Sequence, residues 1–120
     1  MSKIVLAVNA MISNPNLIST VIQNDKEIFF LYKGKYKWSI SLRDGGEHFL
    51  WYYPGIETIQ QLAATEGQEW EGTKMVTYKD NDIGTKEAKA SFSELYTIIK
   101  ERVYGVNEVL DDIIADAEEP

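Results

Sequence analysis

The chain lacks cysteine altogether and contains a single histidine, His48. Without thiols it can form no disulfide, thiolate zinc site, iron–sulfur cluster or cysteine nucleophile. One imidazole cannot build a multi-histidine metal site, and no serine lies in a recognisable nucleophile turn that would recruit His48 as a base. We therefore expect a structural role for His48, in a protein that is not an enzyme and uses no cofactor.

Long hydrophobic runs are also missing, because the longest apolar stretch is Ile4–Val8. A run of this length is far too short to cross a bilayer. Lys3 and the mostly apolar residues 4–12 resemble a signal peptide, but Asn9 interrupts them and no Ala-x-Ala cleavage site follows. Together with the cysteine-free composition, these features predict a cytoplasmic protein that does not associate with membranes.

Basic residues are outnumbered in the second half of the chain. Residues 1–60 carry six Lys/Arg and five Asp/Glu, whereas residues 61–120 carry six and fourteen, within a formal net charge of −7. Direct binding to nucleic acid is therefore not expected. The acidic residues near the C-terminus, with no basic residue among them, are Glu108, Asp111, Asp112, Asp116, Glu118 and Glu119. They predict attraction to a basic protein partner, with a frayed, solubilising tail over 115–120 as the simpler interpretation.

Residues 80–84 open like an EF-hand calcium loop, with Asp80 and Asp82 at ligand spacing. The pattern then fails, because Gly84 stands where a third oxygen ligand is required and Ser91 stands where a glutamate is required. We interpret the segment as a solvated turn and predict no metal site.

A long amphipathic helix is predicted over Ser91–Ala117. Apolar residues recur there at alternating steps of four and three, which places them on one stripe: Phe92, Tyr96, Ile99, Val103, Val106, Leu110 and Ile113. Ser91 and Glu94 form a Ser-x-x-Glu capping box. Gly105 costs about 1 kcal/mol inside a helix and could instead separate two helices. Because the spacing continues in phase across Gly105, we favour one continuous or gently kinked helix.

The middle of the chain predicts an antiparallel meander over residues 27–53. Residues 36–43 alternate strictly between apolar and polar side chains, as a strand with one packed and one wet face would. Asp44-Gly45-Gly46 and Lys33-Gly34-Lys35 supply the turns. A short helix over 56–63 and a strand over 73–79 follow, and residues 85–90 extend the last helix or form a fifth strand.

The N-terminal segment is ambiguous in its periodicity. Ile4, Val5 and Val8 fit one face of a helix, but residues 3–8 could equally form a buried strand. Pro15 suits the first position of a second helix that would continue through residues 17–22. We favour two helices here.

Aromatic residues are concentrated in the predicted meander, which holds nine of the fourteen between Phe29 and Tyr53. Consecutive residues of a strand face opposite sides, so Trp51, Tyr52 and Tyr53 cannot all point into one core. Either helices cover both faces of the sheet or some aromatic side chains face a partner, as tyrosine and tryptophan often do at interfaces. The candidate partner-binding residues are Trp38, Trp51, Tyr52, Tyr53, Asp111, Asp112, Asp116, Glu118 and Glu119.

These features predict an α+β fold for a single domain over residues 1–120, with four or five antiparallel strands packed on a long C-terminal helix. The leading functional hypothesis is a small non-enzymatic protein-binding module, such as an adaptor, a regulator or an inhibitor of the immunity-protein type. It would use the aromatic sheet face and the acidic C-terminal end. Two alternatives are a homo-oligomer assembled through the C-terminal helix and a small-molecule-binding domain with a pocket between sheet and helix.

Overall fold

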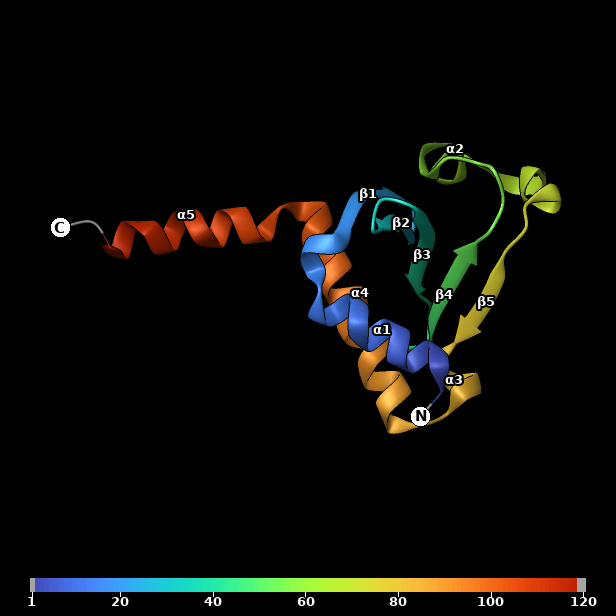
Figure 1. Ribbon diagram of the computed structural model, residues 1–120, viewed down its shortest axis with the longest axis horizontal. Helices are drawn as coiled ribbons and strands as arrows, with labels where there is room; N and C mark the ends of the chain where they lie inside the picture. The colour runs from blue at the N-terminus through green and yellow to red at the C-terminus, as the bar shows by residue number, and fades with distance from the viewer. Residues whose placement is uncertain (1, 119–120) are drawn as a thin grey trace.

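The computed structural model describes residues 2–118 and contains one five-stranded antiparallel sheet with helices on both faces (Figure 1). The strands lie in sequence order, so each one pairs with its neighbours along the chain: β1 (Ile18–Asn24), β2 (Glu27–Tyr32), β3 (Tyr36–Leu42), β4 (His48–Tyr53) and β5 (Val76–Lys79). The helices are α1 (Lys3–Ser13), α2 (Ile59–Ala63), α3 (Asp80–Ile83), α4 (Lys86–Tyr104) and α5 (Val106–Glu118), with two 3-10 segments, η1 (Pro15–Leu17) and η2 (Gly67–Gly72). The predicted α+β architecture is confirmed.

The first face of the sheet carries the larger core, which is closed by α1 and α4. Alternate residues of β2, β3 and β4 point to this face, and Ile28, Phe30, Ile40 and Leu50 are fully buried there. Helix α4 contributes a stripe at helical spacing, with Phe92, Leu95 and Ile99 in the same cluster.

The second face of the sheet is covered by α2 and by Trp70 of η2. Phe29, Trp51, Tyr53, Ile59 and Leu62 form a separate buried cluster there. The polar side of β3 was expected to be wet, yet Ser39 and Ser41 are fully buried. The physical reason is that the segment after β4 folds back over this face, so both sides of the sheet are packed.

The predicted meander over residues 27–53 is confirmed as β2, β3 and β4. The turn between β2 and β3 uses Lys33 and Gly34 at φ 58° and 69°, and the turn between β3 and β4 uses Gly45 and Gly46 at 89° and 87°. The strand expected over 73–79 is shorter, at Val76–Lys79, and residues 80–83 form a single helical turn instead of a loop.

The N-terminal segment is helical, as favoured, but the expected second helix is wrong. Helix α1 is capped by the Ser2 hydroxyl, and Pro15 begins only one 3-10 turn. Residues 18–24 then form β1, which pairs with the edge of β2 through an irregularity between Ser19 and Ile22. Strand pairing prevails because β-branched residues suit both structures, while the edge of β2 offers backbone groups that need partners.

The predicted C-terminal helix differs at its start and at Gly105. It begins at Lys86, where the Thr85 hydroxyl accepts the Ala88 N–H at 3.1 Å, so residues 86–90 extend the helix backwards. Ser91 is not a cap, because it lies inside α4 and its hydroxyl donates to Oδ1 of Asn9 at 2.6 Å. Gly105 adopts left-handed angles, φ 63° and ψ 31°, and separates α4 from α5. Among the helices described, none is long and apolar enough to span a bilayer.

Candidate protein-interaction site

Helix α5 projects from the body of the fold as a separate arm (Figure 1). It makes the molecule elongated, with extents of 58 × 33 × 28 Å. Its aliphatic side chains are largely solvent-exposed, by 50–58% at Val109, Leu110, Ile113 and Ile114. Side chains of this kind are seldom exposed together on one helix unless something else covers them.

The sequence of α5 places these aliphatic residues on one stripe, since they are spaced by three or four positions. The remaining sides carry Glu108, Asp111, Asp112 and Asp116, and no lysine or arginine follows Arg102 in the chain. The three aspartates are exposed, as predicted. Helix α5 ends at Glu118, within the segment expected to be a tail, and Glu119 lies outside the described residues.

Gly105 sets the direction of α5. Its N–H bonds to the carbonyl of Arg102 at 3.3 Å, which ends α4 in the way that left-handed glycines end many helices. Any residue with a Cβ is strained at this φ, whatever the space around it. Glycine therefore allows the sharp change of direction between α4 and α5.

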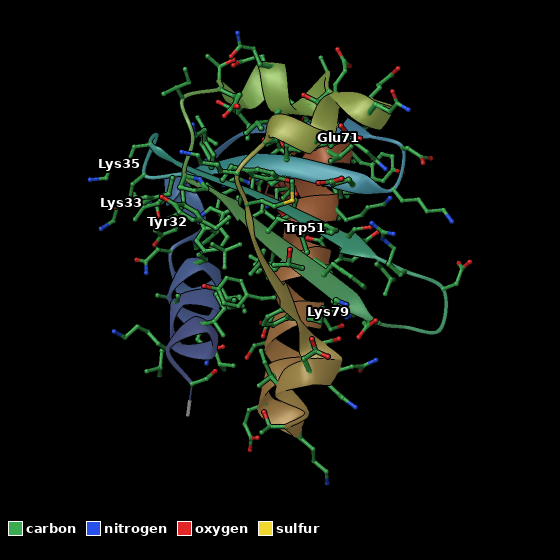
Figure 2. All side chains as sticks on the ribbon, turned by 90° about the vertical axis from the view of Figure 1, so that its right-hand side faces the viewer. Tyr32, Lys33, Lys35, Trp51, Glu71 and Lys79 are labelled. Atoms are coloured by element: carbon green, nitrogen blue, oxygen red, sulfur yellow. The ribbon has the colours of Figure 1, made fainter. Side chains whose placement is uncertain are left out.

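Trp51 and Tyr53 are buried on the second face of the sheet, which corrects the expectation that they face a partner. The Tyr53 hydroxyl donates to Oε2 of Glu27 at 2.8 Å and lies 2.7 Å from the Ser39 hydroxyl. Burial, and then the charge of Glu27, raise the pKa of the Tyr53 phenol far above its ordinary value. In Figure 2, Trp51 lies within the body of the fold, on the middle of the sheet. These residues belong to the core.

Trp38 and Tyr52 point to the first face and are only half-buried. Their ring centroids are 5.0 Å apart, and they pair across β3 and β4. They line an apolar hollow of about 370 Å³ together with Ala7, Ala10, Met11, Tyr32, Tyr36 and Tyr78. This is where helix α1 stops covering the sheet.

A second hollow, of about 390 Å³, adjoins the first and shares Ala7, Trp38 and Tyr78 with it. It continues along α1 toward Lys3 and Ile4. We refer to the two hollows together as the aromatic groove. The groove has α1 as one wall and the aromatic side chains of β2–β5 as the other. The indole N–H of Trp38 is buried and has no hydrogen-bond partner within residues 2–118.

His48 contacts the buried carboxylate of Asp80. Its Nδ1 lies 2.9 Å from Oδ2 of Asp80, and its backbone N–H donates to Oδ1 of the same residue at 3.0 Å. Both side chains are buried, and the Tyr96 ring packs edge-on against the imidazole at 5.7 Å. Asp80 is thus a buried anchor between β4 and α3, which corrects its interpretation as part of a solvated turn. In the described part of the chain, no three acidic or histidine side chains cluster in a way that could hold a metal ion.

No family model, curated protein or solved structure matches the chain.

The predicted candidate residues fall into three places. Trp51 and Tyr53 are in the core, Trp38 and Tyr52 line the groove, and the aspartates lie on the separate helix α5. The small residues Ala7 and Ala10, which form the groove wall on α1, were missed. Their only signal in the sequence is that they stand beside the apolar stripe of a short helix, and the position of that helix on the sheet is a tertiary property.

Proposed function

We propose that the protein is a non-enzymatic, cytoplasmic protein-binding module that docks α5 into an apolar groove with a basic rim. The observation that carries this proposal is the exposure of 50–58% at four aliphatic residues of one helix stripe. The cysteine-free composition fits a reducing compartment. Helix-in-groove docking is a common form of recognition for an amphipathic helix with anchors at this spacing.

Covering the apolar stripe of α5 would stabilise this helix. A helix of 13 residues is marginal in water without tertiary contacts, so α5 gains order when its stripe is covered. Full burial of one aliphatic side chain contributes about 1.5–3 kcal/mol, so burying the exposed half of four such side chains contributes roughly 3–6 kcal/mol. This is enough to offset a substantial part of the cost of association.

The charge of α5 selects the kind of partner. Its flanks are acidic, with Asp111, Asp112 and Asp116 exposed and no basic residue beyond Arg102. Pairing of α5 with a second α5 would bring like charges together along the whole contact. A groove edged by lysine or arginine side chains would instead attract the helix and speed its encounter.

The proposal can be tested with a synthetic 14-residue amphipathic helix that carries leucines on one face and lysines on the flanks. The leucines stand in for the apolar floor of the groove and the lysines for its basic rim. We expect this peptide to bind the protein, more weakly as salt is raised, because the flanking charges are solvent-exposed. A matched peptide with glutamates in place of the lysines should bind at least tenfold more weakly. Calorimetry or fluorescence anisotropy would give both affinities.

The matched variants are Leu110→Asp/Ile113→Asp, which disrupts the stripe, and Ala115→Asp, which adds one charge to the polar side of the same helix. The double variant should lose the basic peptide, whereas Ala115→Asp should retain it. Equal binding of both peptides, or unchanged binding by the double variant, would show that α5 is not the docking element.

A further inference from the structure

The aromatic groove of this chain has the features that the proposed function requires of a partner. We infer that α5 docks into the aromatic groove of a second copy, with the exchange made reciprocally in a two-fold dimer. This inference rests on the proposed function and names its partner.

The lengths of helix and groove agree. The groove follows α1 from Lys3 to Met11, which is about 12 Å at a rise of 1.5 Å per residue. The apolar stripe of α5 from the half-buried Val106 to Ile114 covers the same eight steps, and hence also about 12 Å, with its four exposed members between Val109 and Ile114. Both adjoining hollows can therefore be filled along one stretch of helix.

The lining of the groove suits aliphatic anchors. Ala7 and Ala10 are the smallest helix-forming side chains, so they leave room beside α1 for a helix to approach. The opposite wall consists of tyrosines and Trp38, whose rings offer apolar area at little cost in side-chain entropy. The uncovered apolar surface continues beyond the groove residues, since Leu6 and Val76 are 56% and 44% exposed.

The charges around the groove complement those of α5. Lys3 lines one end, and no aspartate or glutamate is among the described residues that line either hollow. Lys33 and Lys35 project from the turn between β2 and β3, beside Tyr32 (Figure 2). The Lys35 ammonium lies 4.9 Å from the centroid of the Tyr36 ring, at the rim of the groove. Acidic flanks on α5 therefore meet a basic rim.

The helix of the same chain is directed away from this groove. Only Gly105 separates α4 from α5, and Figure 1 shows α5 leaving the body on the side opposite to β4 and β5. A second copy can supply the helix without any change at Gly105. Each copy contributes one α5 and one aromatic groove, so in a closed two-fold dimer both helices are docked and both grooves are filled.

The experiment uses light scattering on the full chain and two kinds of variant. The helix variant is Leu110→Asp/Ile113→Asp, and the groove variant is Ala10→Arg, which places a large charged side chain at an exposed position of α1. The controls are Ala115→Asp on α5 and Ala90→Arg, which is exposed on α4. We expect twice the chain mass of 13.7 kDa for the natural sequence and for both controls. Each test variant should dissociate about 30-fold or more readily, as loss of a central anchor does.

Mixing the two variants gives the decisive result. The helix variant retains an intact groove and the groove variant retains an intact helix, so an equimolar mixture should form a heterodimer through one remaining contact. Native mass spectrometry would detect this species because the two chains differ in mass. Pairing of α5 with α5 predicts no such rescue, and no effect of Ala10→Arg.

Three outcomes would overturn the inference: a natural chain that stays monomeric, a dimer insensitive to Ala10→Arg, or a mixture that forms no heterodimer. The proposed function is judged separately with the basic peptide. If the protein is monomeric but binds this peptide through α5, the result supports the proposed function and contradicts only the self-docking. If the protein neither dimerises nor binds the peptide, both the proposed function and the self-docking are contradicted.

Discussion

The carboxylate of Asp80 contacts His48 twice, accepting its backbone N–H at 3.0 Å and lying 2.9 Å from its imidazole Nδ1. The two residues are 32 positions apart, and this contact ties the start of β4 to α3. Because the carboxylate accepts from both groups, neither of these two buried donors is left without a partner. It holds the end of the sheet where α4 begins.

Replacement of Asp80 should therefore destabilise the protein. Asp80→Ala leaves the His48 backbone N–H and ring without their acceptor in a buried place, at a cost of about 1–3 kcal/mol in the free energy of unfolding. Urea denaturation followed by tryptophan fluorescence would measure it. Asp82→Ala, at an exposed position of the same helical turn, serves as the control and should change the free energy by less than about 0.5 kcal/mol. Equal effects of the two substitutions would contradict the anchoring role.

Because the pKa of the Tyr53 phenol is raised, we expect the protein to lose stability at alkaline pH. Its pKa is raised in the folded protein, so above the unfolded value of about 10 the unfolded chain releases a proton that the folded chain keeps. The stabilising contribution is fully present below pH ~10 and falls by about 1.4 kcal/mol per pH unit above it. Urea denaturation at several pH values should give a steeper decline for the natural chain than for Tyr53→Phe.

The Tyr53→Phe comparison isolates one phenol from the six other tyrosines. At neutral pH the variant should lose about 1 kcal/mol, since the hydrogen bond to Glu27 is removed. Parallel pH profiles for the two proteins would mean that Tyr53 ionises as readily in the folded state as in the unfolded state.

Replacement of Gly105 should change the shape of the molecule more than its stability. Alanine in the left-handed conformation costs about 1–2 kcal/mol, whereas alanine is the best helix former, so Gly105→Ala should favour a straight junction between α4 and α5. Spin labels on Ser93→Cys and Ala115→Cys attach uniquely, because the natural chain has no cysteine. In a straight helix the 22 steps between them span about 33 Å. The label distance should lengthen toward that value in Gly105→Ala. Gly105→Asn should keep the bent distance, because asparagine is strained less than other residues with a Cβ at left-handed angles.

The sequence contained enough to predict the central sheet. The alternation over residues 36–43 and the glycine turn after Asp44 determine β3 and its hairpin locally, so tertiary context was not needed. Residues 18–24 were misassigned because Val21 and Ile22 fit a helix and a strand equally well. The choice between them depends on the free edge of β2, which periodicity does not reveal.

The candidate site was less predictable. Glycine inside a helix costs only about 1 kcal/mol relative to alanine, so Gly105 alone does not decide whether the helix continues. The apolar stripe continues in phase on both sides of Gly105 and is compatible with both a straight and a broken helix. The burial of Trp51 and Tyr53 depends on Trp70, which lies 17 or more positions later in the chain. The ring centroids of Trp70 and Tyr53 are 6.0 Å apart, in the cluster that also contains Trp51. The aromatic groove depends on how far α1 covers the sheet. The acidic character of α5, by contrast, could be seen directly in the sequence.

The lysines at the β2–β3 turn give the last prediction, which concerns the charge match between groove and helix. Lys33→Glu/Lys35→Glu should weaken the dimer at least tenfold at low salt and much less at high salt, because exposed charges act over a Debye length of about 10 Å at 0.1 M. Light scattering over a dilution series would measure the dissociation constant at each salt concentration. Lys74→Glu/Lys86→Glu makes the same charge change at exposed positions elsewhere and should leave the dimer intact. Adding Asp111→Lys/Asp112→Lys to the Lys33→Glu/Lys35→Glu variant should restore much of the affinity. If none of these changes altered the dissociation constant, the charges of the turn and of α5 would not contribute to the docking.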